Sequence, residues 1–121
     1  MARTLALLLV CAWLLSSATS IDAHHSTAMY TGSRTVTGKV VKWEWTNPHA
    51  HVYIETKDDK GATVVWDVEL MSLNHLRSYG WTAKTVKVGD TVSATGLYAK
   101  NGDPAMIASR MKLADGREIS S

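Results

Sequence analysis

Hydrophobic and polar residues alternate over several short segments of this chain, as they do in half-buried β-strands. The alternation is clearest after Pro48, where Val52 and Ile54 fall on one face and polar or amphipathic residues fall on the other. Segments of the same kind, rich in β-branched and aromatic residues, recur along the chain. They predict five strands, over residues 35–45, 49–57, 63–69, 91–98 and 106–113.

Turn-forming residues separate these segments. Asn47-Pro48 ends the first segment, and residues 58–61 (Asp-Asp-Lys-Gly) and 101–104 (Asn-Gly-Asp-Pro) are typical of hairpin turns. Gly38, inside the first segment, indicates a bulge or a sharp bend there. Consecutive strands are therefore expected to be antiparallel neighbours.

Between the third and fourth segments the apolar residues change their spacing. Leu73, Leu76 and Tyr79 recur at the period of a helix. Ser72 can cap the start of such a helix, and Gly80 can close its end. We therefore expect one short helix at this point.

The order of these elements predicts the fold class. Three strands, a helix and two strands follow one another in OB-type barrels, which close five strands in a Greek-key order. We therefore expect a mainly β protein, a small five-stranded OB-like barrel with one short helix between strands three and four. Trp66 is expected in its core and Trp81 at one end of the barrel. A different small β-barrel or a sandwich-like sheet also fits this element order.

The N-terminus has a different pattern. Arg3 precedes an unbroken apolar run over residues 5–15, which has the length of a secretory signal and is too short to span a bilayer. Small residues follow the run, so cleavage after Ser20 or after Ala23 fits. Cleavage after Ala23 would make His24 the first residue of the mature protein.

A cleaved signal of this kind places the mature protein in the periplasm or outside the cell, without stable membrane insertion. The single cysteine, Cys11, lies within the signal, so the mature domain has neither a disulfide nor a thiolate metal site. Three parts are expected: a signal peptide over residues 1–23, an N-terminal arm over 24–34 and a β-barrel domain over 35–121.

Charge and motifs narrow the classes of function. The formal net charge is only +2 at pH 7, whereas nucleic-acid binding needs a clustered basic face. We find no nucleophile elbow, phosphate-binding loop or spaced pair of acids in the sequence. We therefore expect no nucleic-acid partner and no enzymatic activity.

Four of the five histidines occur in two pairs: His24-His25 and His49-x-His51. Residues two apart on a strand point to the same face, and neutral imidazole is a good ligand for copper and zinc. A free α-amine on His24 would add a further nitrogen ligand. One hypothesis is therefore a copper or zinc site made by His24, His25, His49 and His51. The alternative is that His24 and His25 belong to a polar arm, that His49 caps a turn and that His51 faces solvent on its strand.

Aromatic and acidic residues are candidates for ligand binding. Trp43 and Trp45 share one face of the first strand, where they either form a stacking platform or cover the core. Because the chain has no phenylalanine, at least one of them is expected in the core. Tyr53 and Glu69 would share the outer face of a hairpin with the second histidine pair, and Asp67 or Glu69 would supply a further metal ligand.

Several short motifs occur in an order that resembles a known family. They are His24-His25-Ser26, Trp45-Thr46-Asn47-Pro48-His49, Trp66 with Glu69, Gly80-Trp81, Gly89-Asp90 and Asp115-Gly116. Over nearly the whole mature chain, the sequence resembles the exported bacterial proteins called domain of unknown function 6152. It lacks an acidic residue expected near Thr31. The element order also resembles that of small periplasmic OB-fold proteins.

The resemblance implies an exported β-rich domain with no established activity, and it supplies no catalytic residues. Together with the residues themselves, it predicts an exported binding module. One interpretation is that the module binds a divalent metal through histidines. The other is a metal-free structural module of the cell envelope that binds a small ligand or an envelope protein.

Overall fold

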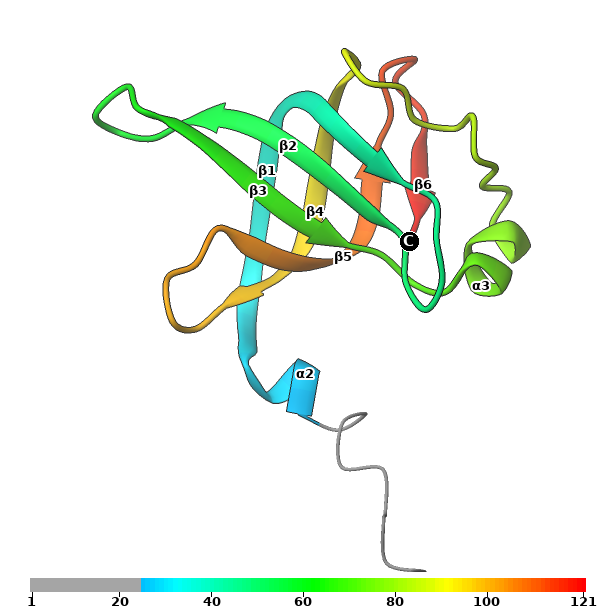
Figure 1. The fold of residues 1–121 in the computed structure, drawn as a ribbon, viewed down its shortest axis with the longest axis horizontal. Helices are drawn as coiled ribbons and strands as arrows, with labels where there is room; N and C mark the ends of the chain where they lie inside the picture. The colour runs from blue at the N-terminus through cyan, green and yellow to red at the C-terminus, as the bar shows by residue number, and fades with distance from the viewer. Residues whose placement is uncertain (1–24) are drawn as a thin grey trace, which may run out of the picture.

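A computed structural model describes residues 25–121, which form a small β-barrel and two short helices (Figure 1). The predicted signal peptide and His24 lie outside the described residues. The elements are α2 (His25–Ala28), β1 (Tyr30–Glu44), β2 (His51–Lys57), β3 (Thr63–Glu69), α3 (Leu73–Ser78), β4 (Thr91–Ala99), β5 (Ala105–Lys112) and β6 (Glu118–Ser120).

The strands form one sheet in the order β3-β2-β1-β4-β5-β6, which a parallel pairing of β3 with β5 closes on itself. The long strand β1 serves both halves of the barrel. Its residues Tyr30–Lys39 pair with β4, and residues from Lys39 to Glu44 pair with β2. The prediction of a mainly β, OB-like fold with a short helix between strands three and four is confirmed.

Gly38 lies where β1 passes from one neighbour to the other. A Cβ atom at this position would lie 2.1 Å from the backbone oxygen of Glu55 on β2, so the close approach of the two strands requires glycine. A register shift between Val40 and Lys42 follows directly. The irregularity predicted from Gly38 is therefore present at this point of the strand.

The inner faces of the strands and one side of α3 form a single core. Val52 and Ile54 of β2 are fully buried, as the alternation predicted, and Trp66 is only 8% exposed. Trp81 is 1% exposed and donates a hydrogen bond from Nε1 to the backbone oxygen of Ser120, 2.7 Å away. Both tryptophans thus occupy the buried positions expected of them.

The short helix has the boundaries that its capping residues predicted. The Ser72 hydroxyl accepts a hydrogen bond from the backbone N–H of His75, and Leu73 and Leu76 face the core. Gly80 follows the helix with a φ of +94°, a conformation that glycine adopts without strain. No helix among residues 25–121 has the length and apolar character needed to cross a membrane.

Several strand boundaries differ from the prediction by one or two residues, including the start of β2, which is His51 instead of His49. Two differences are larger. The arm expected over residues 24–34 is shorter, because β1 already begins at Tyr30, where it pairs with Ala99 of β4. Residues 31–35 are all exposed, so no apolar alternation marks them as a strand. The second difference is a sixth strand, β6, which pairs with β5 where only a tail was expected. The Asp115-Gly116 pair forms the turn between them, with Gly116 at a φ of +88°.

Candidate functional site

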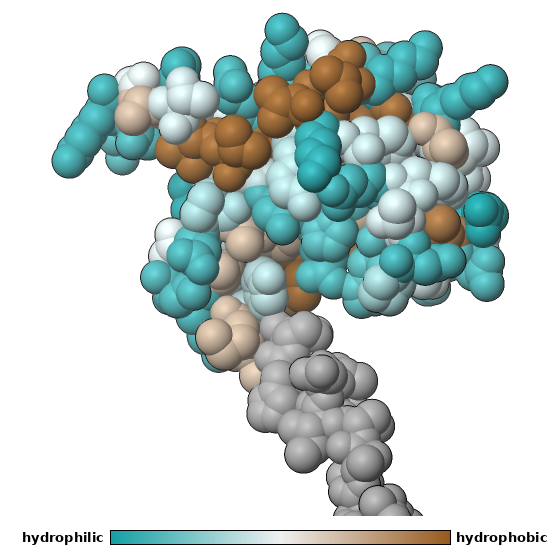
Figure 2. Space-filling model, viewed as in Figure 1, coloured by the Kyte–Doolittle hydropathy of each residue, from teal (hydrophilic) through white to brown (hydrophobic). Residues whose placement is uncertain are grey.

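The outer surface of β2 and β3 carries the second histidine pair together with acidic residues. The two strands are antiparallel, with His51 opposite Glu69 and Tyr53 opposite Asp67. The residues between them face the core, so these four side chains point outward. Figure 1 shows β2 and β3 on the side towards the viewer, and Figure 2 shows that the centre of this surface is mostly hydrophilic.

Each histidine contacts a carboxylate on the neighbouring chain segment. Nδ1 of His51 lies 2.6 Å from Oδ1 of Asp67, and Nδ1 of His49 forms a hydrogen-bonded pair with Oε1 of Glu69. We call the five residues His49, His51, Tyr53, Asp67 and Glu69 the histidine–carboxylate face.

This arrangement orients both imidazoles in the same way. A carboxylate accepts a hydrogen bond, so a neutral ring beside it carries its proton on Nδ1 and keeps a lone pair on Nε2. The side chains of His49 and His51 are 45% and 26% exposed, so solvent reaches them. Carboxylates hold metal-binding histidines in this orientation in many metalloproteins.

A lysine–glutamate pair on β1 extends the face. The register places Glu44 opposite His51 and Lys42 opposite Tyr53. The Lys42 ammonium forms an ion pair with Glu44 and also lies over the Tyr53 ring, 5.0 Å from its centroid. Because Lys42 hydrogen bonds to Glu44, the pKa of this carboxyl is lowered. Burial, together with the charges of Asp67 and Glu44, raises the pKa of the Tyr53 hydroxyl.

The start of β1 lies close to the same carboxylates. The pKa of the Tyr30 hydroxyl is raised by burial and then by the negative charges of Glu69 and Asp67. The hydroxyl of Tyr30, the first residue of β1, is therefore within reach of the charges at one end of the histidine–carboxylate face. His24 and the side chain of His25 lie outside the described part of the structure.

The described residues alone do not provide a complete metal site. Over residues 25–121, no group of three or more histidine, cysteine, aspartate and glutamate side chains is arranged to hold a metal ion. His49 and His51, which the sequence paired, do lie next to each other on one surface. A cation bound there would need ligands from another part of the chain or from solvent.

Trp43 and Trp45 do not belong to this face. Trp43 sits opposite the buried Val52, and its Nε1 donates a hydrogen bond to the backbone oxygen of Ala83, 2.9 Å away. Its ring lies 5.6 Å from that of Trp45 and 6.1 Å from that of the buried Trp81. Both are half-buried and pack against the core, so they cover the core instead of forming an open stacking platform.

The ligand-binding candidates from the sequence therefore separate into two groups. Tyr53 and Glu69 lie on the histidine–carboxylate face, whereas the two tryptophans lie on the opposite side of β1. Sequence analysis did not include Lys42 and Glu44 in the site. The positions of Lys42 and Glu44 beside the site depend on how β1 pairs with β2. The only sequence pattern that could have indicated them is the alternation of side chains within β1.

The fold and this face define a small OB-like barrel with a polar outer surface on its second and third strands. The chain belongs to the Family of unknown function (DUF6152), whose model matches residues 10–108. Among solved structures, it is similar to the mitochondrial single-stranded DNA binding protein Rim1 from S. cerevisiae. The identity is 11%, the match covers 68% of this chain and 92% of that chain, and the TM-score is 0.52. At this identity the similarity is one of fold. No curated protein matches the chain significantly in sequence.

Proposed function

We propose that this protein is an exported, non-enzymatic binding module that holds a divalent cation, Cu(II) or Zn(II), on its histidine–carboxylate face. The observation that carries the proposal is the pair of neighbouring histidines, His49 and His51, whose Nδ1 atoms each contact a carboxylate. Two Nε2 atoms with available lone pairs on one surface are the start of a site that suits copper or zinc.

The other ligands are proposed to come from the N-terminal histidines. Five residues lie between His24 and Tyr30, and His25–Ala28 form the short helix α2. If α2 unwinds, the six steps of chain from His24 to Tyr30 span at most about 20 Å. Glu69 and Asp67 are close enough for their charges to act on the Tyr30 hydroxyl, so an extended chain of this length reaches the face. If the mature protein begins at His24, its α-amine and imidazole chelate a cation together, which suits the tetragonal preference of Cu(II).

Charge also favours a cation over a nucleic acid as the ligand. The face and its extension on β1 contain three carboxylates, from Glu44, Asp67 and Glu69, and one ammonium, from Lys42. Phosphate backbones need the opposite balance. The similarity in fold to a DNA-binding protein is therefore no reason to expect the same ligand here, because one fold can serve different functions.

The test is calorimetric titration of the tag-free exported protein with Cu(II) and with Zn(II), after its N-terminus has been identified by intact mass. We expect one cation per chain. A His49→Ala, His51→Ala double substitution should weaken binding by about tenfold or more, because two ligands are lost. Binding should also weaken in acid, since protonated imidazole cannot bind a metal ion.

His75 provides the matched control. It lies on α3, where its ring packs edge-on against Tyr79 at 5.0 Å, so His75→Ala removes an imidazole from outside the face. This variant should bind like the wild type. A version with one extra residue before His24 should bind Cu(II) more weakly.

Equal binding by the wild type and the double variant would refute the metal site. In that case the metal-free module, which binds a small ligand or an envelope protein, becomes the better explanation. A mature protein that still contains Met1 or Arg3 would refute the proposed export with signal cleavage.

A further inference from the structure

The barrel has an opening on the side of its first strand. β1 pairs with β2 only from Lys39 onward, so the β2–β3 hairpin diverges from the earlier half of β1. β3 pairs with β5 only over Asp67–Glu69, and its earlier half borders the same opening. The backbone pairing therefore leaves a space between β1, the hairpin and the loop that follows β4.

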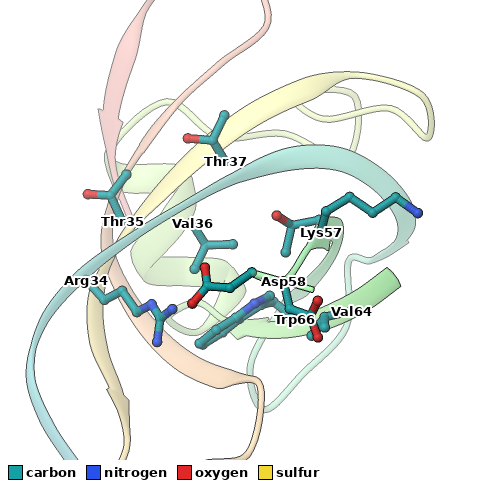
Figure 3. Close-up of a pocket in the computed structure, with 10 residues that line it drawn as sticks. Arg34, Thr35, Val36, Thr37, Lys57, Asp58, Val64 and Trp66 are labelled. Carbon is teal, nitrogen blue, oxygen red and sulfur yellow. The ribbon is translucent and has the colours of Figure 1, made fainter. Parts of the chain in front are cut away.

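Two hollows occupy this space, with volumes of about 230 Å³ and 570 Å³. Arg34 of β1 and Val64 and Trp66 of β3 line both of them, so the two hollows adjoin at these residues. We call this space the Arg34–Trp66 groove. Its size falls in the range of sites that bind small organic molecules. Figure 3 shows the side chains of Arg34 and Trp66 pointing toward each other from their two strands.

The larger hollow has apolar walls. Tyr98 and Pro104 line it together with Val64 and Trp66. The ring of Tyr98 packs tightly against Gly32, where a Cβ atom would lie 2.7 Å from Cε1 of the tyrosine. The absence of a side chain at Gly32 therefore leaves room for the Tyr98 ring at this wall of the hollow.

Arg34 is the charged group that stands at the junction. Its guanidinium carbon lies 4.8 Å from the centroid of the Trp66 ring, in a cation–π contact. Within residues 25–121, no carboxylate forms an ion pair with Arg34. A guanidinium that lies over an aromatic ring can still direct its N–H groups to a planar anion.

The acidic residues around the groove are engaged elsewhere or exposed. Oδ1 of Asp58 accepts two backbone hydrogen bonds within its own hairpin turn, each of 2.9 Å. Oδ2 of Asp103 accepts a hydrogen bond of 2.9 Å from the side chain of Asn101. Asp59 is exposed.

Two lysines also line the groove, Lys57 in the smaller hollow and Lys100 in the larger one, and the ammonium of Lys57 donates a hydrogen bond to the hydroxyl of Thr63. Arg34 is the cation that lines both hollows, so its positive charge is placed where they adjoin.

We propose that the Arg34–Trp66 groove binds a small amphipathic carboxylate. The carboxylate of the ligand pairs with the guanidinium of Arg34 through two parallel N–H···O bonds. Its apolar body fills the larger hollow against Trp66, Tyr98 and Pro104. This site shares no residue with the histidine–carboxylate face, so it does not depend on the proposed cation site.

Octanoate is a suitable probe, and the experiment is a titration of the ¹⁵N-labelled exported protein in the presence of EDTA. The chelator removes any cation, so the histidine–carboxylate face does not contribute. We expect octanoate to shift the indole N–H signal of Trp66 with saturation. Octanol, which lacks the charge, and acetate, which lacks the apolar body, should bind at least about tenfold more weakly.

Arg77 offers a matched control for substitution. Its guanidinium carbon lies 5.6 Å from the ring centroid of Trp45, so it makes the same kind of stack outside the groove. Arg34→Gln should weaken octanoate binding about tenfold or more, whereas Arg77→Gln should leave it unchanged. Val64→Trp, which keeps Arg34 but fills both hollows, should also abolish binding. It tests the site if Arg34→Gln does not fold.

Three results would overturn the proposal. The first is octanol binding as tightly as octanoate. The second is Arg34→Gln and Arg77→Gln binding octanoate equally well. The third is octanoate shifting the indole signals of Trp43 and Trp45 while that of Trp66 stays in place.

Discussion

The imidazole of His51 and the carboxylate of Asp67 meet across two neighbouring strands, with Nδ1 and Oδ1 2.6 Å apart. The contact is diagonal, because His51 stands directly opposite Glu69 in the register. His49 makes the same kind of contact with Glu69. One strand register therefore orients both rings with Nε2 away from the carboxylates.

This relationship predicts the tautomer of His51. In the wild type, the neutral ring should carry its proton on Nδ1, which long-range ¹H–¹⁵N spectra of the imidazole report. Asp67→Asn replaces the charged acceptor and should allow a mixture of tautomers. The stability should change by less than about 1 kcal/mol, because the pair is partly exposed. His75, which does not contact Asp67, should keep its spectrum, and an unchanged His51 spectrum would contradict the assignment.

The Lys42–Glu44 ion pair predicts a pH dependence. Lys42 lowers the pKa of the Glu44 carboxyl below its ordinary 4.5. A lowered folded-state pKa adds stability above the unfolded-state value, and this contribution is lost as the pH falls through the folded-state pKa. In Lys42→Met, a carboxyl-detected NMR titration should therefore find Glu44 titrating at a higher pH than in the wild type. The same titration midpoint in both proteins would show that the pair has no effect.

Trp66 should be among the most costly core positions to truncate. Its ring is buried, so Trp66→Ala should lower the free energy of unfolding by about 3–5 kcal/mol. Denaturant unfolding followed by circular dichroism measures the change. Val88, which is 67% exposed, is the control, and Val88→Ala should change stability by no more than about 0.5 kcal/mol. A loss below about 1 kcal/mol for Trp66→Ala would place its ring outside the core.

Gly38 should not tolerate even a methyl group. The added Cβ atom would lie 2.1 Å from the backbone oxygen of Glu55, so β1 and β2 would have to move apart. Gly38→Ala should lower the free energy of unfolding by about 1–3 kcal/mol, as overpacking does. Lys39→Ala, at the exposed next position, should cost no more than about 0.5 kcal/mol. Equal thermal midpoints for the two variants would rule out the close approach.

Local patterns in the sequence were sufficient to predict most of the elements. β3 has the predicted boundaries, and α3 lies between its cap Ser72 and Gly80. Alternation and capping act between residues that are close along the chain, so they can be recognised before the fold is known. The strand β6 could also have been predicted, because Asp115-Gly116 is a strong hairpin signal. The first residues of β1 could not, because exposed residues without alternation become a strand only through pairing with β4.

The sequence alone was enough to place His49 and His51 side by side, because residues two apart on an extended chain share a face. It also put Asp67 and Glu69 on one face of their own strand. Only the tertiary structure decided which acid meets which histidine, because that depends on the register between β2 and β3. It likewise brought Arg34 onto Trp66, 32 positions apart in sequence, since barrel closure sets β1 against β3. Local periodicity assigns residues to faces, whereas long-range strand pairing determines which faces and side chains meet.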